Sequence, residues 1–144
     1  KLYFIINARK ATLEKDGYYH LFLYDAGSIV GCKDANQEKL HNTQALKEFI
    51  HSWKMKKNLD SVEADITGIQ VDNTTIGHTQ FYASVKLSRP EFYENDNLLI
   101  FDVTPSKTIE NMNKIINFDN ATIYINGCDL FSCQKKINCE STLQ

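Results

Sequence analysis

The sequence predicts an α+β domain in which a curved, mostly antiparallel sheet wraps around one long amphipathic helix. Between Asn42 and Asn58, apolar residues recur at the i, i+3, i+4 and i+7 spacing of a single buried helical face. These residues are Leu46, Phe49, Ile50 and Trp53. After this helix, alternating apolar residues separated by turns predict consecutive strands, and strands joined by short turns pair antiparallel.

The segment before the long helix predicts a further helix and one brief strand. Apolar residues near one helical face and a stop at Asp16-Gly17 favour a helix over residues 2–16, although Tyr3–Ile6 also suits a short buried strand. A second short apolar piece, Tyr18–Tyr24, ends at a turn, and residues 28–32 are typical of a brief strand.

The segment after the long helix predicts four strands and a short helix. Gly68 interrupts the alternation of the first strand, which indicates a β-bulge. Arg89-Pro90 closes the second strand, and Thr104-Pro105 begins a helix that ends near Asn117. The four strands are expected at residues 62–71, 81–87, 98–103 and 121–125.

Length and composition predict one domain over residues 1–144, with a cysteine-bearing tail at about 126–144. The chain is 42% hydrophobic and 24% charged, as in globular proteins, and its formal net charge is −2. This charge does not suit a broad nucleic-acid interface. No apolar run approaches the ~20 residues of a membrane-spanning helix. Because no cofactor motif or metal-ligand spacing occurs, we expect neither a cofactor nor a metal.

Four cysteines indicate a disulfide-stabilised chain. The even count suits two disulfides, and the sequence leaves three connectivities open. We expect Cys32 to pair with one of the three late cysteines, Cys128, Cys133 and Cys139. Four reduced thiols in a cytosolic protein are the alternative.

Two glycosylation sequons favour a secreted glycoprotein. They are Asn73-Thr74-Thr75 and Asn120-Ala121-Thr122, both in polar, turn-like stretches. A chain that opens at Lys1 without Met also suits a processed product. A viral polyprotein fragment is another alternative, because residues 141–144 have the Ser-Thr-Leu-Gln pattern left by a 3C-like protease.

About half of the chain, from Leu21 to Leu87, resembles the nuclear transport factor 2-like superfamily. The similar stretches are LFLYDAGSIVGC, TQALKEFIHSW and VEADITGIQVDNTTIGHTQFYASVKL. Gly31-Cys32 and the segment Ile125–Cys133 are similar to secreted nematode members. The resemblance implies a cone-shaped, cystatin-like fold. Residues 88–118 depart from the pattern, because a helix after Pro105 is not usual in this superfamily.

The resemblance also implies where catalytic residues would lie. Enzymes of this superfamily, such as ketosteroid isomerase and scytalone dehydratase, place Asp, His and Tyr in an apolar cone that shifts their pKa values towards working pH. The candidates in this chain are His20, Asp25 and Tyr82. A small isomerase or dehydratase is therefore the alternative function. Asp25 also suits a turn residue before Gly27, which would have no catalytic role.

Aromatic residues at exposed-parity positions favour a recognition surface over a catalytic site. The candidate binding residues are Tyr82, Phe92 and Tyr93, at exposed-parity or loop positions, together with Tyr18 and Tyr19, which are expected beside the mouth of the cone. The sequence thus predicts a secreted binding domain for a small apolar ligand or a partner protein, without covalent catalysis. A homodimer formed through the sheet is a further expectation.

Overall fold

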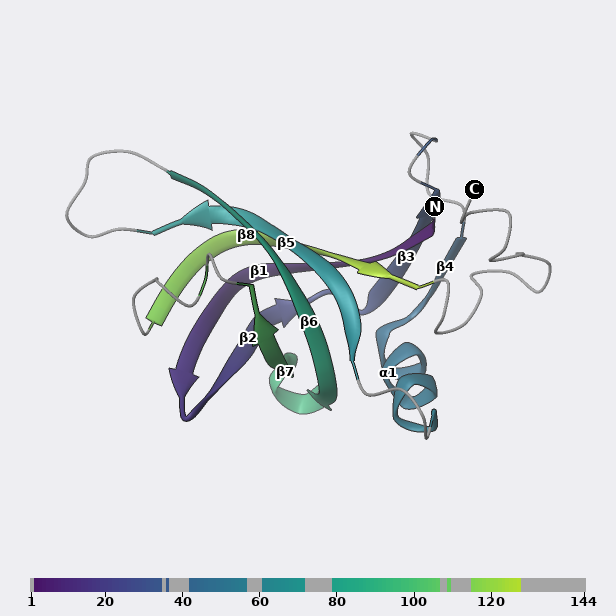
Figure 1. Ribbon diagram of the computed structural model, residues 1–144. Coiled ribbons are helices and arrows are strands. Elements are labelled where there is room, and N and C mark those ends of the chain that lie inside the picture. The colour runs from purple at the N-terminus through teal and green to yellow at the C-terminus, as the bar shows by residue number, and fades with distance from the viewer. Residues whose placement is uncertain are drawn as a thin grey trace.

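In the computed structural model, the chain forms an eight-stranded antiparallel sheet that closes on itself. The strand order is β2-β7-β6-β5-β8-β1-β3-β4, and β2 also pairs with β1. Strands β1, β2, β7, β6, β5 and β8 therefore form a closed wall. The first part of β1 pairs with β3 instead of β2, so that β3 and β4 extend the sheet to one side (Figure 1).

The structure describes residues 2–34, 36, 42–56, 61–71, 79–106, 109 and 115–127. The strands are β1 (Leu2–Asp16), β2 (Tyr18–Ala26), β3 (Ile29–Asp34), β4 (Asn42–Ala45), β5 (Val62–Gln70), β6 (Thr79–Tyr93), β7 (Leu98–Pro105) and β8 (Ile115–Asn126). The helices are α1 (Leu46–Lys54) and the single 3₁₀ turn η1 (Glu94–Asp96).

The predicted α+β fold with a long central helix is wrong. Helix α1 has nine residues, and the residues just before it form β4. The four apolar residues of its stripe are buried as predicted. However, α1 lies at one end of the closed wall (Figure 1), where Phe49 packs against Phe4 and Trp53 against Phe101, with ring centroids 4.9 and 5.4 Å apart. The sheet therefore does not wrap around the helix.

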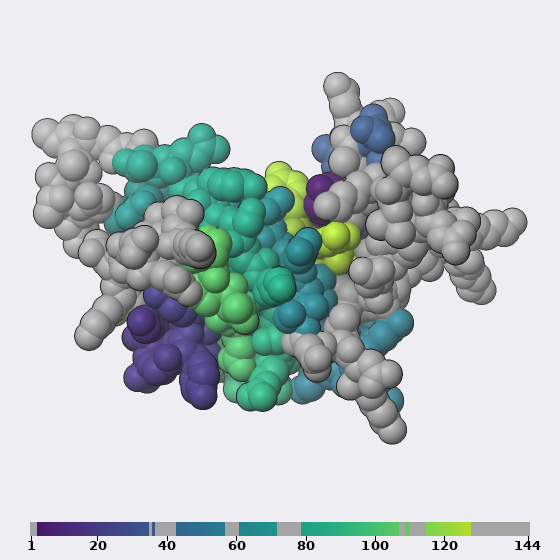
Figure 2. Space-filling view, in the orientation of Figure 1, coloured from purple at the N-terminus to yellow at the C-terminus, as the bar shows by residue number. Residues whose placement is uncertain are grey.

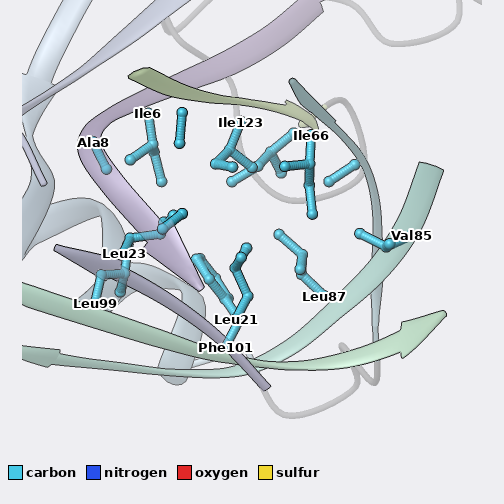
Figure 3. Close-up of a cluster of buried hydrophobic side chains, with 14 of the residues drawn as sticks. Ile6, Ala8, Leu21, Leu23, Ile66, Val85, Leu87, Leu99, Phe101 and Ile123 are labelled. Carbon is cyan, nitrogen blue, oxygen red and sulfur yellow. The ribbon is translucent and has the colours of Figure 1, made fainter. Parts of the chain in front are cut away.

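Side chains from the strands fill the interior of the closed wall. Residues from all six strands of the wall converge there (Figure 3): Ile6, Leu21, Leu23, Ile66, Leu87, Leu99, Phe101 and Ile123, each 0% exposed. Among the described residues, no polar or charged side chain is buried. Each large apolar side chain buried in this way contributes roughly 1.5–3 kcal/mol. The interior is therefore an apolar core.

The helix predicted for residues 2–16 is also wrong, because this segment is the long strand β1. Its inward-facing residues step by two up to Ala8 and then by three to Ala11, so the pattern imitates a helical period. Strand β8 makes the same change between Phe118 and Ala121, which pair with Ala11 and Ala8. In both strands the inward-facing residues therefore change from even to odd numbers at the same place in the sheet.

The predicted end of the second strand at Arg89-Pro90 is wrong, since β6 continues to Tyr93. The register between β6 and β7 shifts between Ser88 and Glu91. Such a bulge leaves residues outside the ladder and so accommodates a proline inside a paired strand.

The predicted helix from Pro105 to Asn117 is wrong at both ends, because both ends lie in strands. Strand β7 ends at Pro105 and β8 begins at Ile115. Between them only Ser106 and Ile109 are described, and Ile109 is 0% exposed. The other residues of the predicted helix up to position 114 lie outside the described residues.

The bulge predicted at Gly68 is confirmed. The register between β5 and β8 shifts between Thr67 and Ile69. A Cβ atom on Gly68 would lie 2.4 Å from Cδ2 of Phe118. Phe118 is 1% exposed and stacks on Phe81 at 4.8 Å, so its ring has no room to move away.

Replacing Gly68 with alanine is therefore expected to lower the free energy of unfolding by about 1–3 kcal/mol, the usual cost of overpacking a core. Urea denaturation measures this change. Gly27→Ala is the matched control, because the nearest atom to its added Cβ is 3.8 Å away and no stability loss is expected. Equal stabilities of the two variants would contradict the packing described for Gly68.

Candidate functional site

His20 lies on the outer surface of the wall, opposite Asp102 of β7. The two residues are directly paired in the sheet, and His20 Nδ1 lies 3.0 Å from Asp102 Oδ1. Their side chains are 31% and 35% exposed. Ser88 pairs with Asp102 on the other side, so the carboxylate lies between the serine and the histidine. A serine nucleophile needs the histidine in the central position, and this order does not provide it.

Asp25 lies at a bend of β2 and forms an ion pair with Arg9 of β1. Its φ is 51°, a left-handed conformation that Asp and Asn adopt more readily than most residues. Asn120 of β8 has the same φ of 51° and lines the same shallow hollow as Arg9 and Asp25. Asp25 therefore has a local structural role near the place where the alternation of inward- and outward-facing residues shifts in β1 and β8.

Tyr82 lies on another part of the wall, within a small hydrogen-bonded group. Its hydroxyl lies 3.3 Å from Asp65 Oδ1 and 3.2 Å from Ser84 Oγ, and Ser84 Oγ donates to the same carboxylate oxygen at 2.7 Å. Asp65 and Ser84 line a hollow of about 460 Å³ on the outer face of β5 and β6. Tyr82 is 59% exposed.

The three candidate catalytic residues thus occupy three separate places, and none faces the interior. The apolar cone expected for an isomerase or dehydratase is instead a core without a buried polar side chain among the described residues. An apolar site can shift the pKa of a carboxyl or imidazole group only if that group lies inside it. The geometry therefore gives no support to the enzyme alternative.

The predicted binding aromatics do not form one surface either. Tyr19 is 8% exposed, with the Lys15 Nζ atom 5.4 Å from its ring centroid. Phe92 is partly buried against the core. Tyr18 and Tyr93 are 79% and 50% exposed, but they lie at opposite ends of the β2–β7–β6 region.

Tyr93 instead belongs to an apolar surface that the sequence reasoning missed. Tyr24 of β2 pairs with Leu98 of β7, which pairs with Tyr93 of β6, and Phe22 pairs with Ile100 one step along. We call these five residues the outer-wall strip. β2 is far from β6 and β7 in the sequence but pairs with β7 in the sheet, and Figure 2 shows the purple early part of the chain beside green parts of the chain.

The outer-wall strip is open to solvent. The rings of Phe22 and Tyr24 stack, with centroids 6.4 Å apart and planes 13° from parallel. Tyr24 and Tyr93 are 41% and 50% exposed, and the other three residues are half-buried. Their sequence neighbours Leu23 and Leu99 face the core with 0% exposure. These strands therefore carry apolar side chains on both faces.

Only some of the cysteines and sequons in the predictions lie among the described residues. Cys32 is 3% exposed, and the described residues include no free cysteine. Cys128, Cys133, Cys139 and Asn73 lie outside the described residues. Asn120 is exposed in β8. The disulfide connectivity and the glycosylation stay predictions.

Comparisons with protein-family models, with curated proteins and with solved structures found no match. The resemblance to the nuclear transport factor 2-like superfamily therefore stays a prediction. Among the described residues, no helix is long and apolar enough to cross a membrane. Within the same residues, no group of three or more His, Cys, Asp or Glu side chains is placed to hold a metal ion.

Proposed function

We propose that this protein is a non-catalytic binding domain that recognises a partner protein through the outer-wall strip. The observation that carries the proposal is a group of five adjoining apolar side chains on the outer face of three paired strands, two of them exposed and three half-buried. Contiguous apolar patches on a folded surface commonly mark sites of protein association. Two of the five are tyrosines, which are enriched at interfaces because they combine a large apolar area with one polar group.

A partner protein suits this geometry better than a small apolar ligand. Ligand pockets are concave and combine apolar walls with a few polar groups that orient the ligand. The described interior has the apolar walls but no buried polar side chain, and its side chains pack against one another (Figure 3). The strip lies on the outside of the wall, where a protein surface of complementary apolar character can cover it.

The extracellular setting belongs to the same proposal. Two sequons and the even cysteine count support it, and so does the absence of a free thiol among the described residues. In this setting a disulfide at Cys32 would stabilise β3, in which Cys32 is the cross-strand neighbour of Phe4 of β1.

Photo-crosslinking from the strip tests the proposal. Tyr93 is replaced by the photoreactive residue p-benzoylphenylalanine, and the protein is irradiated in an extract of the organism that produces it. We expect a specific crosslinked partner, which mass spectrometry identifies and which is then purified. Tyr82 is the matched control, because it lies on the same strand, is 59% exposed and is outside the strip.

Crosslinks of equal yield to the same protein from positions 82 and 93 would contradict a binding surface confined to the strip. The absence of any crosslinked protein from position 93 would also contradict it. A crosslink to a second copy of the chain would identify the partner as the protein itself.

A further inference from the structure

A second hollow, of about 700 Å³, lies between the β1–β2 turn, the end of α1 and the β6–β7 pair. Three cations line it: Lys54, Lys56 and Arg89. Two acids, Glu91 and Asp102, line it as well. The chain as a whole carries a net charge of −2, so this hollow is a local excess of positive charge on an acidic protein.

Arg89 is held in an unusual backbone conformation at the bulge of β6. Its φ is 48°, in the left-handed region that disfavours side chains other than Gly, Asn and Asp. It also precedes Pro90, which further restricts its backbone. Residues with such strain tend to occur at functional sites, where the surrounding structure imposes it. The bulge leaves the Arg89 side chain 86% exposed at the hollow.

The two acids of the hollow already have partners other than Arg89. Asp102 Oδ1 lies 3.0 Å from His20 Nδ1, and Glu91 Oε2 accepts a hydrogen bond from Lys54 Nζ at 3.0 Å. Arg89 forms a long ion pair with Asp102, but the 3.9 Å between its Nε atom and Asp102 Oδ2 is too long for a hydrogen bond. Lys56 has no ion-pair partner among the residues that the structure describes.

We propose that this hollow binds an oxyanion: a carboxylate, sulfate or phosphate group. The guanidinium of Arg89 supplies parallel N–H donors that match two oxygens of such a group, and Lys56 supplies a second positive charge. The hydroxyl groups of Ser88 and Thr104 also line the hollow and can donate to the remaining oxygens. The site goes beyond the proposed function, because its lining includes none of the five strip residues.

NMR titration of the ¹⁵N-labelled full chain tests the site. Sodium acetate, sulfate and phosphate are added separately at constant ionic strength, while the Nε–H signal of Arg89 and the amide signals of residues 88–91 are followed. We expect a saturable shift with a dissociation constant on the order of millimolar for at least one probe. The probe with the lowest constant identifies the preferred oxyanion.

Arg89→Asn removes the guanidinium while keeping a residue that tolerates positive φ, so the bulge is expected to persist. We expect this variant to bind the preferred probe at least about tenfold more weakly, as the loss of a charge-assisted pair predicts. Arg9→Gln is the matched control, because Arg9 is the chain's other arginine and pairs with Asp25 elsewhere on the wall. Unchanged binding in Arg89→Asn, or no saturable shift with any of the three probes, would overturn the proposal.

Discussion

Replacing Trp53 with alanine is expected to lower the free energy of unfolding by about 3–5 kcal/mol, as for other large core residues. The Trp53 side chain is 3% exposed at one end of the core. Its ring centroid lies 5.4 Å from that of Phe101 and 6.1 Å from that of Phe49. Its removal would leave a cavity between α1 and the closed wall. Chemical denaturation followed by circular dichroism measures the loss.

Met55→Ala is the control for this prediction. Met55 follows Trp53 by two residues but is 67% exposed, so its truncation is expected to change stability by no more than about 0.5 kcal/mol. If Trp53→Ala lost less than about 1 kcal/mol, α1 could not be the element that closes this end of the core.

Replacing Ile100 with lysine is expected to weaken binding of the crosslinked partner about 100-fold, which corresponds to roughly 2.7 kcal/mol. Ile100 pairs with Phe22 on one side and with Glu91 on the other. Since Glu91 already bonds Lys54, covering the strip with an apolar surface would bury the new lysine charge without a carboxylate of its own. The fold should persist, because Ile100 points outward and the lysine amine can reach water. Titration calorimetry with the purified partner measures the affinity, and thermal unfolding checks the fold.

The strands after α1 could be predicted because their apolar residues follow a simple pattern. The expected strands at 81–87, 98–103 and 121–125 lie within β6, β7 and β8, and the bulge at Gly68 is present. The helical stripe that ends at Trp53 was equally clear, since all four of its apolar residues are buried. Local periodicity is sufficient for such elements.

The fold class could not be predicted because two local signals were misleading. The three-residue step from Ala8 to Ala11 belongs to a strand that exchanges its faces, yet it matches a helical period. Residues 42–45 continue the polar pattern of the helix, but they pair with β3. In both cases pairing with strands distant in the sequence decides the local structure. The apolar pattern of one segment carries no information about these partners.

The outer-wall strip was missed for a different reason. Leu98–Phe101 is a continuous apolar run, which is typical of a strand buried on both faces. The sequence does not indicate that one face of β7 stays open. Similarly, the pairing of His20 with Asp102 joins residues 82 positions apart, and it depends on a register that no local pattern specifies.

Recognition through the strip is tested by the dissociation constant of the partner. This constant is measured for the original chain, for Ile100→Lys and for Ile29→Lys. Ile29 is 57% exposed but lies on β3, outside the strip, so the two variants introduce the same charge at an isoleucine inside the strip and at one outside it. The outer-wall strip predicts a constant raised about 100-fold for Ile100→Lys and nearly unchanged for Ile29→Lys. Equal constants for all three proteins, or an equal loss in both variants, would contradict recognition through the strip.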